Sequence, residues 1–550
     1  MPSTKTLSTN NRRLNDLGGG TVGGLIARRA AGHPDKSAIV TPTGSMTYGE
    51  LDLTAYRVAA GLTGLGLEVG DSVAILMRNR IEWIAAWAGA ARGGFVCVPV
   101  NTAYKGTFLL HALQLTSARV IITQPAFLPA LEEVTAELAH PVHVVCINSS
   151  EPATAPMEND SSVPRVIGWS DLEKQANADY SAPELNPHDV AMIALTSGTT
   201  GRSKGVVCPH QMLTVAAREN VEAMETQNWD RLYTCLPLFH GAALLNITLH
   251  SIYAGATVVI GDRFSASRFW TDVKANGITM FNALGSVLPM LLAQPRREDD
   301  RDNPVRKVFA APAPPEVLMP FEDRFDLHIV EGYGLSEIKN VTYNPLTGRK
   351  IGSIGKPTRT TELQIQGENG EPLAPGAVGE IVYRPRTSGV MYTHYLADPE
   401  ATIASMRDLW WRTGDLGYAD DDGFYYFVDR KKDALRRRGE NISSYEVESV
   451  LLSFPGITEA AAVGTPSELG EDEVLAVIGT DNPDNLNLDA LYEHCDQRLP
   501  HFMVPRYFRV LADLPRTPTG KIRKAELRSG GVTDLTWDSH AAGRKPTRVI

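Results

Sequence analysis

Short apolar segments alternate with amphipathic ones through much of the chain, and this alternation limits the fold more than any other feature. "SVAILM" (72–77) and "FVCVPV" (95–100) have the length and composition of buried strands, and "RIEWIAAWAGAARGG" (80–94) between them is typical of a helix that ends at glycines. The rhythm recurs at "RVIIT", "VHVVCI", "GATVVI" and "GITMFNAL". Strands that alternate with helices form parallel sheets covered by helices on both faces, so we expect an α/β fold.

The chain of 550 residues is longer than one hydrophobic core usually supports, so we expect at least two domains. After Arg349 the residue pattern changes to short strand-like segments separated by glycine-containing turns, as in "TELQIQGENGEPLAPGAVGEIVYRP". This pattern predicts a smaller strand-rich subdomain. The basic cluster at 429–448 opens a final α+β unit. We therefore expect a large N-terminal domain over 1–430 and a small C-terminal domain over 431–550.

Two segments are predicted to be irregular. Residues 148–165 are polar and contain prolines, which is typical of a surface loop. The residues after Leu527 are polar and contain glycines, and we expect them to form a loosely ordered tail.

The composition is that of an ordinary soluble protein, with 43% apolar and 21% charged residues. The net charge of −11 argues against nucleic acid as a main partner, because phosphate backbones recruit basic surfaces. The five cysteines form no CxxC pair, which indicates neither a zinc site nor a disulfide framework. The sequence has neither the apolar core of a signal peptide nor a run of ~20 apolar residues, so we expect a cytoplasmic protein without integral membrane association.

A loop rich in glycine and hydroxyl residues stands at 195–207, "LTSGTTGRSKGVV". It follows the strand-like "VAMIAL" and precedes a helix expected near His210, so its N–H groups and hydroxyls can point at an anion. The spacing differs from the common phosphate loop, which has four residues between its glycines and a lysine directly after the second. The alternative is a polar surface turn. The candidate phosphate-binding residues are Thr196, Ser197, Gly198, Thr199, Thr200, Gly201 and Lys204.

The second motif is "EGYGLSE" (331–337), in which Tyr333 stands between Gly332 and Gly334 after Glu331. The glycines allow close backbone approach, and the tyrosine ring can lie against a base. Ser336 offers a hydroxyl to a phosphate, and Glu337 offers a hard oxygen ligand to Mg²⁺. Taken alone, the motif could equally be a glycine-rich turn with a buried tyrosine.

Two further motifs lie toward the C-terminal end. In "WWRTGDLGYADDDGFYYFVDRKKD" (410–433), Asp415 is a candidate acceptor for ribose hydroxyls and Arg430 a candidate donor. The run "ADDDG" lacks the spacing of a calcium loop and favours a solvated hairpin turn. In "LPRTPTGKIRKAEL" (514–527), Lys521 stands on a rigid turn, and its plain alternative is a surface lysine.

The order and separation of these motifs resemble those of the adenylate-forming superfamily, which includes acyl-CoA synthetases, peptide-synthetase adenylation domains and firefly luciferase. The resemblance covers the chain from about Thr21 to Leu527. Within the superfamily, "PLFHGAALLN" (237–246), "RFSASRFW" (263–270) and "GEIVYRP…GVMYTHYLADPEAT" (379–402) are most similar to medium- and long-chain acyl-CoA ligases of the crotonobetaine/carnitine-CoA ligase type.

The resemblance implies a two-step ligase with ATP, Mg²⁺ and coenzyme A. A small-molecule carboxylic acid attacks the α-phosphorus of ATP, pyrophosphate leaves, and CoA thiolate then displaces AMP from the acyl-adenylate. An adenylation enzyme that loads a carrier-protein thiol and a nucleotide-binding regulatory protein are the other readings, and a homodimer is left open.

For the phosphates, the resemblance implies that the loop from Thr196 to Lys204 holds and then releases pyrophosphate. Ser336 would contact the α-phosphate and Glu337 would bind Mg²⁺. Lys521 would reach the acid carboxylate and the α-phosphate together, where its charge offsets the repulsion between two anions.

For the nucleoside, Tyr333 would stack on adenine, and Asp415 and Arg430 would hold the ribose. Ala311 and Pro312 occupy a segment that lines adenine in the family, where glycine is usual at the position of Ala311. A Cβ and a missing N–H there alter a backbone contact, which leaves open an enzyme that performs only the thioester step on a supplied acyl-adenylate.

The resemblance also implies that the C-terminal domain rotates between the two steps about a hinge at Lys432. The rotation would withdraw Lys521 and bring the segment around Gly439 in to form the pantetheine tunnel. The basic run 436–438 would then meet CoA phosphates, or it is a solvated charged hinge.

For the acid, His240 resembles a gate between the acyl pocket and the CoA tunnel, with a purely structural histidine as the alternative. Gly241, Ala242 and Gly285 are small and would leave room for a bulky or long acid. Lys339 and Asn340 follow Glu337 near the acyl end of the site, where small or apolar residues are more usual in the family. The cation there could recognise a second polar group on the acid or face solvent.

Overall fold

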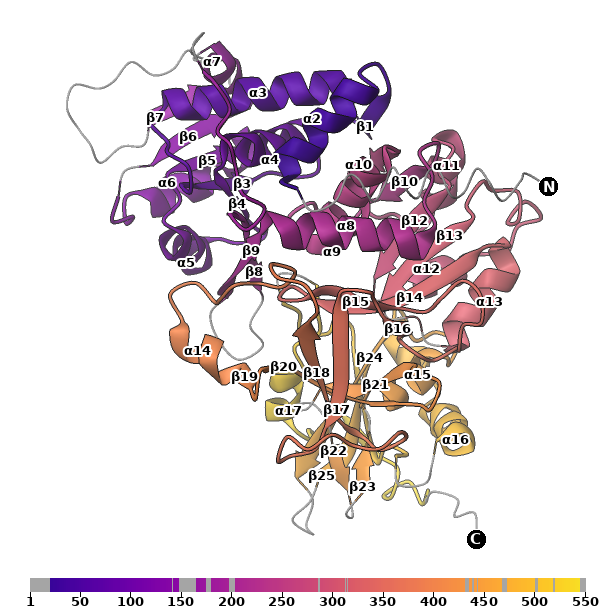
Figure 1. Ribbon diagram of the computed structural model, residues 1–550. Coiled ribbons are helices and arrows are strands. Elements are labelled where there is room, and N and C mark those ends of the chain that lie inside the picture. Colours follow the sequence, from indigo (N-terminus) through magenta and orange to yellow (C-terminus); the bar gives the residue numbers. More distant parts are fainter. Residues whose placement is uncertain are drawn as a thin grey trace.

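The computed structural model describes residues 20–140, 142–147, 165–174, 180–196, 203–284, 287–311, 313, 315–430, 435–437, 440–442, 444–466, 472–499, 503–517 and 520–544. Two large sheets with their helices lie in the upper part of Figure 1, and a strand-rich sheet and a small C-terminal sheet lie below them. The predicted α/β class, with a smaller C-terminal domain, is confirmed.

Within the described residues, seven strands form the first large sheet: β3 (Ser72–Leu76), β4 (Val96–Pro99), β5 (Val120–Thr123), β6 (His143–Cys146), β7 (Arg165–Gly168), β8 (Val190–Thr196) and β9 (Lys204–Pro209). Their order is β7-β6-β5-β3-β4-β8-β9, and β8–β9 is the antiparallel pair. The helices along this stretch are α3 (Tyr48–Gly64), α4 (Ile81–Gly93), α5 (Gly106–Thr116), η1 (Pro125–Phe127), α6 (Leu128–Thr135) and α7 (Trp169–Lys174).

The second large sheet contains β1 (Ser37–Thr41), β2 (Gly44–Thr47), β10 (Arg231–Thr234), β11 (Thr257–Ile260), β12 (Met280–Leu284), β13 (Lys307–Ala311), β14 (His328–Leu335), β15 (Lys339–Tyr343) and β16 (Lys356–Pro357). The neighbours from β1 to β14 by way of β11, β10, β12 and β13 are parallel, whereas β14–β15–β16 and β1–β2 are antiparallel. Its helices are α2 (Val22–Gly32), α8 (His210–Met224), α9 (Gly241–Ala243), the π-helical η2 (Leu244–Leu249), α10 (His250–Ala254), α11 (Phe269–Ala275), α12 (Val287–Leu292) and α13 (Pro315–Phe325).

Local signals explain where two of these helices begin and end. The Thr47 hydroxyl accepts from the Glu50 N–H while the Glu50 carboxylate accepts from the Thr47 N–H, so a capping box starts α3. Helix α4 ends at Gly94, whose φ of 74° suits a residue without a Cβ.

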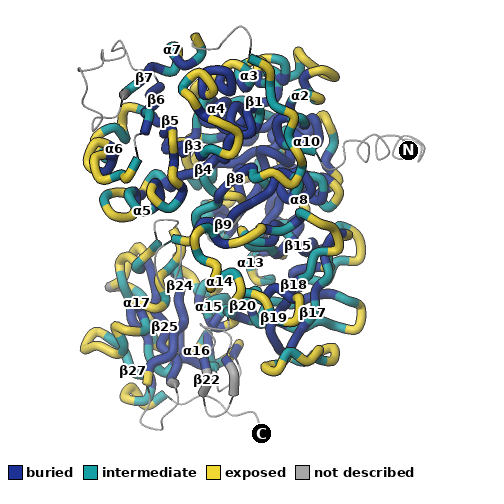
Figure 2. The backbone as a smooth tube through the Cα atoms, turned by 60° about the vertical axis from the view of Figure 1, so that its left-hand side comes forward, coloured by how far each residue is buried: buried dark blue, intermediate teal, exposed yellow. Residues whose placement is uncertain are grey.

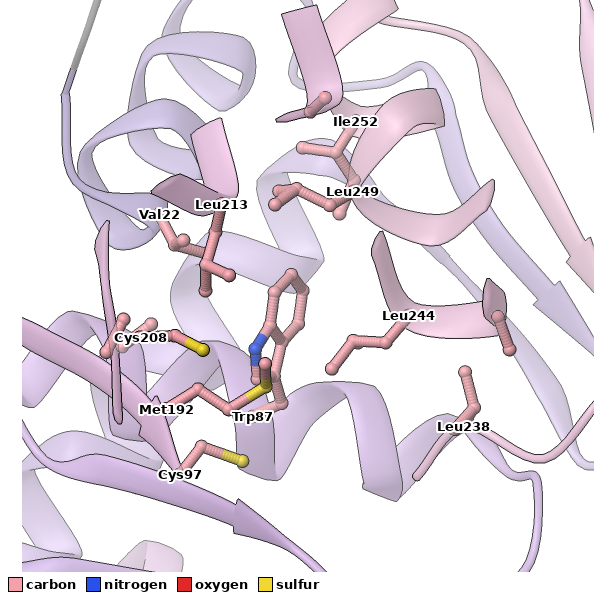
Figure 3. Packing of buried hydrophobic residues seen from close by; sticks show 14 of the residues in the cluster. Val22, Trp87, Cys97, Met192, Cys208, Leu213, Leu238, Leu244, Leu249 and Ile252 are labelled. Atoms are coloured by element: carbon pink, nitrogen blue, oxygen red, sulfur yellow. The ribbon is translucent and has the colours of Figure 1, made fainter. Parts of the chain in front are cut away.

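One apolar core joins the two large sheets. Trp87 of α4 is 1% exposed and lies among Met192 of β8, Leu213 of α8 and Leu244 of η2 (Figure 3). Burial of an aromatic side chain of this size contributes about 2–3 kcal/mol. The core therefore fixes the ends of β8 and the start of the η2 helix relative to each other.

The strand-rich sheet consists of β17 (Thr361–Gln366), β18 (Gly379–Pro385), β19 (Met406–Arg407), β20 (Trp410–Ala419) and β21 (Tyr425–Arg430), with α14 (Pro399–Ala404) before β19. The acidic run 420–422 forms the predicted hairpin turn between β20 and β21. Asp420 accepts hydrogen bonds from the N–H groups of Asp422 and Phe424, each at 3.0 Å.

The C-terminal part contains β22 (Leu435–Arg437), β23 (Glu440–Ile442), α15 (Ser444–Leu452), β24 (Glu459–Pro466), β25 (Asp472–Gly479), η3 (Pro483–Asn485), α16 (Leu488–Arg498), β26 (Tyr507–Leu511), α17 (Lys524–Gly530) and β27 (Thr536–Asp538). Figure 2 shows buried backbone along β24 and β25, around which this part has its own apolar core.

The expectation of a loosely ordered tail after Leu527 is wrong for the residues up to 544. Strand β27 pairs with β26, and Trp537 packs edge-on against Phe508 with ring centroids 5.5 Å apart. Arg506 and Asp538 form an ion pair at 3.0 Å. The composition of this segment is mostly polar, and one aromatic side chain, Trp537, anchors the three-residue strand. The composition therefore did not indicate that the segment is ordered.

The predicted loop at 148–165 lies outside the described residues up to 164, and Arg165 begins β7. None of the helices in the described part of the chain combines the length and the apolar character that crossing a membrane requires.

Candidate active site

The β14–β15 hairpin carries Tyr333 and Glu337, and its tightness explains the glycines of "EGYGLSE". A Cβ at Gly334 would lie 2.1 Å from the carbonyl oxygen of Lys339, and one at Gly332 would lie 2.8 Å from that of Thr342. Real Cβ atoms do not come so close, so both positions require glycine for the hairpin to close. The fold itself therefore accounts for these glycines, which the sequence analysis assigned to the approach of a ligand.

Tyr333, Asp415 and Arg430 come together where this hairpin contacts β20 and β21 of the strand-rich sheet. The Tyr333 hydroxyl donates to Oδ2 of Asp415 at 2.6 Å, and Nε of Arg430 lies 3.1 Å from Oδ1 of the same carboxylate. Asp415 and Arg430 are direct partners across the β20–β21 pair. Burial next to the Asp415 carboxylate raises the pKa of Tyr333 well above its usual value. Three residues predicted to hold the nucleoside thus form one contact group.

Glu337 is held by a residue that the sequence analysis did not name. The Tyr395 hydroxyl donates to Oε1 of Glu337 at 2.9 Å, and Nζ of Lys204 lies over the Tyr395 ring, 4.6 Å from its centroid. Burial raises the pKa of Glu337, while the hydrogen bond from Tyr395 acts in the opposite direction. The signal that could have identified Tyr395 is its place in "GVMYTHYLADPEAT", the segment that carries the narrower family likeness.

Strand β9 connects the phosphate loop to this group. Thr196 and Lys204 are register partners at the ends of β8 and β9, and the Thr196 hydroxyl lies 3.4 Å from the Lys204 carbonyl. The Leu396 N–H donates to the Gly205 carbonyl at 2.8 Å, so the Tyr395 segment runs along β9. The sequence analysis had expected a loop directly before the helix at His210, without this strand.

Several candidate residues fall outside the described residues, and their roles stay predictions. They are Ser197, Gly198, Thr199, Thr200, Gly201, Gly285, Pro312, Lys432 and Gly439.

Glu331 lies behind Tyr333 and is almost fully buried. Its Oε1 accepts from the Ala313 N–H at 3.0 Å, and its Oε2 has no hydrogen-bond partner among the described residues. Burial raises the pKa of Glu331 to about 8, so the side chain is mostly neutral at pH 7. Ala311, at the end of β13, is partly exposed, whereas Ser336 is exposed at the hairpin end.

His240 and Lys521 lie close enough to interact through their charges. Burial, with a further contribution from the Lys521 ammonium, lowers the pKa of His240 to about 4. Lys521 stands on a turn in which the Thr517 N–H donates to its carbonyl at 2.7 Å and Gly520 has a φ of 82°. Gly241, directly after His240, is exposed. The C-terminal part thus directs Lys521 toward the large domain.

Lys339 is buried and does not face solvent. Its Nζ donates to Oε2 of Glu219 at 2.5 Å, and the two side chains are 1% and 2% exposed. The Glu219 carboxylate therefore already compensates the charge of the Lys339 ammonium. The role of Lys339 toward the acid stays a prediction.

Glu337 suits a magnesium ion that is held jointly with phosphates. Mg²⁺ is commonly bound through one or two carboxylates together with substrate phosphates. Among the described residues no group of three or more histidine, cysteine, aspartate or glutamate side chains could hold a metal. Glu337 is a single carboxylate whose Oε1 is oriented by Tyr395, and it fits a site in which a carboxylate and substrate phosphates hold Mg²⁺ together.

Comparison with known proteins agrees with this arrangement. The AMP-binding enzyme family model matches residues 26–395, and the model of the AMP-binding enzyme C-terminal domain matches residues 446–521. The chain is 33% identical to a sulfoacetate–CoA ligase of Cupriavidus necator over 92% of this chain and 97% of that protein. It is 29% identical to the crotonobetaine/carnitine–CoA ligase of Escherichia coli, over 88% and 93%.

A solved structure shares the fold as well. The o-succinylbenzoate–CoA synthetase of Bacillus subtilis, in complex with ATP and a magnesium ion, has a TM-score of 0.77 at 27% identity, and the match covers 92% of this chain and 98% of that one. The chain therefore belongs to the AMP-binding enzyme family and is an AMP-forming acyl-CoA ligase, as the sequence resemblance implied.

Proposed function

We propose that this ligase activates a small-molecule carboxylic acid with ATP at the site formed by the β14–β15 hairpin, β20–β21 and the start of α9, and then transfers the acyl group to coenzyme A. The observation that carries the proposal is the contact group of Tyr333, Asp415 and Arg430, whose tyrosine belongs to the same β14–β15 hairpin as Glu337 with its Tyr395 partner. Lys521 of the C-terminal part would add the cation that this site needs.

The first step joins two anions. The acid carboxylate attacks the α-phosphorus, the bond between the α-phosphorus and the bridging oxygen breaks, and pyrophosphate leaves with that oxygen. Two like charges at contact distance repel strongly in a water-poor site. The Lys521 ammonium offsets that repulsion and stabilises the charge that develops in the transition state.

Asp415 and Arg430 would hold the ribose, because a carboxylate accepts from two hydroxyls while a guanidinium donates to them. Thr196 and Lys204 would contact the departing phosphates, and Ser336 would reach the α-phosphate. The Lys204 ammonium lies over the ring of Tyr395, whose hydroxyl bonds to Glu337, so Lys204 and Glu337 contact the same tyrosine.

Glu337 would hold the magnesium ion, which supplies positive charge to the phosphates when it is bound. The hydrogen bond from Tyr395 orients its carboxylate and favours the ionised form, which a metal ligand needs. The o-succinylbenzoate–CoA synthetase was solved in complex with ATP and a magnesium ion, which supports the presence of this metal in the reaction.

The second step would use another position of the C-terminal domain, residues 431–550. Rotation about Lys432 would withdraw Lys521 and bring the segment around Gly439 to the site. His240, neutral because its pKa is about 4, would border both the acid and the CoA path. The small residues Gly241 and Ala242 leave room for a bulky or long acid beside it.

The thioester-only reading and the carrier-protein reading are not favoured. The relatives named above are CoA ligases, and the groups required for adenylation are retained at Lys521, Glu337 and Lys204. In the altered segment that follows Ala311, the Ala313 N–H donates a hydrogen bond to Glu331, so this backbone group has a partner within the protein.

The proposal is tested by separating the two half-reactions in Lys521→Ala. Loss of a charge that acts in the transition state costs ~10²–10³-fold, so pyrophosphate exchange with ATP should fall by about that factor. Thioester formation from a synthetic acyl-adenylate and CoA should change less than about threefold. Arg523→Ala, which removes an exposed cation on the same turn, is the control and should leave both steps intact. Equal loss of both steps in Lys521→Ala contradicts the assignment.

A further inference from the structure

Three asparagines from separate elements meet between α8, η2 and β15. Nδ2 of Asn340 on β15 lies 3.1 Å from Oδ1 of Asn246 on η2 and 3.3 Å from Oδ1 of Asn220 on α8. Nδ2 of Asn220 also points to Oδ1 of Asn246 at 3.5 Å. We call Asn220, Asn246 and Asn340 the amide cluster.

The amide cluster connects the helical stretch that follows His240 with the hairpin that carries Glu337. Asn246 belongs to the continuous helical stretch α9–η2–α10, which starts at His240. Asn340 belongs to the β14–β15 hairpin, which carries Glu337. On the proposed function, an acid whose carboxylate lies near His240 would extend along the side of η2 toward the cluster.

The side of η2 that holds Asn246 is the accessible one. Leu244 and Leu249 point into the core around Trp87 (Figure 3) and are 1% and 0% exposed. Leu245 and Asn246, between them, are partly exposed, and so is Asn340. A π-helical turn of this kind is frequent at functional sites, because it re-aims side chains within a helix.

The surroundings of the cluster are polar but electrically balanced. Tyr343 donates its hydroxyl to Oδ1 of Asn220, and the buried Lys339–Glu219 pair lies on the neighbouring residues of α8 and β15. We call Tyr343, Lys339 and Glu219, together with the amide cluster, the wall. The second oxygen of Glu219 accepts from the Thr360 hydroxyl at 2.7 Å. Lys339 is thus already neutralised, and a further anion at this wall would meet no uncompensated charge from that pair.

The hydrogen bonds within the cluster leave the amide nitrogen of Asn246 and the amide oxygen of Asn340 unused. They engage Oδ1 of Asn246 and Nδ2 of Asn340, so among the described residues Nδ2 of the former and Oδ1 of the latter have no partner. A hydroxyl or a carboxamide can accept from the one and donate to the other. An alkyl group would cover both amides and leave them unsatisfied, which costs free energy.

We infer that the acid carries, away from its carboxylate, an uncharged hydrogen-bonding group, a hydroxyl or a carboxamide, that binds Asn246 and Asn340. This inference rests on the proposed function, because it concerns the acid of that reaction. The two asparagines are specificity residues on this view, and the rest of the wall positions them.

The test compares acids of matched length that differ only at the far end. Suitable sets are 4-hydroxybenzoate, 4-carbamoylbenzoate, 4-methylbenzoate and terephthalate, and 6-hydroxyhexanoate, 6-carbamoylhexanoate, heptanoate and heptanedioate. The readout is kcat/KM from pyrophosphate release with ATP and CoA. A site built to bind a substrate hydroxyl discriminates by up to ~10⁴–10⁵-fold against its alkyl analogue, and for partly exposed amides we expect about tenfold or more.

Variants then assign the preference to the cluster. Asn340→Leu and Asn246→Leu should each reduce the hydroxyl-to-methyl ratio of kcat/KM by about tenfold. Asn228→Leu, at an exposed asparagine on the same domain, should leave the ratio unchanged. Thermal unfolding checks that each variant is folded, and the wild-type comparison stands without them.

Each outcome decides the matter. A wild type that prefers the methyl member, or the dicarboxylate, overturns the inference. So does a preference for the hydroxyl member that survives both leucine variants. If no acid releases pyrophosphate at all, the proposed function fails and the inference falls with it, whereas turnover of the alkyl acids alone leaves the proposed function in place.

Discussion

The hydroxyl of Tyr333 donates a 2.6 Å hydrogen bond to Oδ2 of Asp415, and this contact links the end of the second large sheet to the strand-rich sheet. Both residues are buried, at 8% and 1% exposure. Arg430 takes the other carboxylate oxygen at 3.1 Å. The residues proposed to bind adenine and ribose therefore hold one another in place, and such preorganisation lowers the entropic cost of binding a nucleotide.

Tyr333→Phe should weaken ATP binding while the fold is kept. The variant retains the ring but leaves a buried carboxylate with one partner fewer, which costs about 1–3 kcal/mol of stability. Because Asp415 loses its orientation, we expect KM for ATP to rise about 3–10-fold with a smaller change in kcat. Tyr426→Phe, which removes a 3.0 Å hydrogen bond to Asp420 at the hairpin turn, should leave KM unchanged. An unaltered KM in Tyr333→Phe contradicts the preassembled site.

Tyr395→Phe should increase the magnesium requirement. The Tyr395 hydroxyl bonds to Glu337 and acts to lower its pKa, so its removal raises that pKa further and leaves less carboxylate at a given pH. The concentration of Mg²⁺ at half-maximal activity should therefore rise about 3–10-fold, most strongly at the acidic end of the pH range. Tyr426→Phe, which loses a hydroxyl contact to Asp420 at the β20–β21 turn instead, serves as the control. Equal magnesium curves for both variants would argue against Glu337 as the ligand.

The residues recognisable from the sequence are those whose chemistry depends on a short stretch of chain. Tyr333, Asp415 and Lys521 stand in motifs whose residue types and order identify them, and the first two are brought together as expected. The alternation of apolar and amphipathic segments likewise indicated the parallel sheets, because burial on both faces has a local signature.

What the sequence could not provide are partners from distant segments. The sequence near Glu337 does not indicate Tyr395 as its partner, and the sequence near Lys339 does not indicate Glu219. Each contact forms only when the sheets have assembled. The short strand around Trp537 was missed for the same reason, since a three-residue strand has too little pattern of its own. Tertiary context overrides local propensity at such positions.

Glu219→Gln should destabilise the protein far more than Glu222→Gln on the same helix. The Glu219–Lys339 pair is almost fully buried, so loss of one partner leaves an uncompensated charge and costs about 3–5 kcal/mol. Glu222 is exposed and pairs with Arg359 at 3.4 Å, which is worth at most about 0.5–1 kcal/mol. Denaturant unfolding of both variants measures the difference. Similar losses would show that the buried pair is not a structural element of the wall.

Stability should fall as the pH drops from 6.5 toward 4, and His250 should account for part of the slope. Burial lowers the pKa of His250 to about 4, whereas an unfolded histidine titrates near 6.5, so in this window the unfolded state binds more protons. Stability is thus fully present above pH 6.5 and is lost as the pH falls, by on the order of 3 kcal/mol for this group. In His250→Gln, the difference between the free energies of unfolding at pH 7 and pH 4.5 should shrink, although hydrogen bonds to Thr226 and Asn246 make some loss at neutral pH expected. His33→Gln, at an exposed histidine, should keep the wild-type slope. A slope in His250→Gln that equals the wild-type slope would mean that this imidazole is protonated in the folded protein as readily as in the unfolded one.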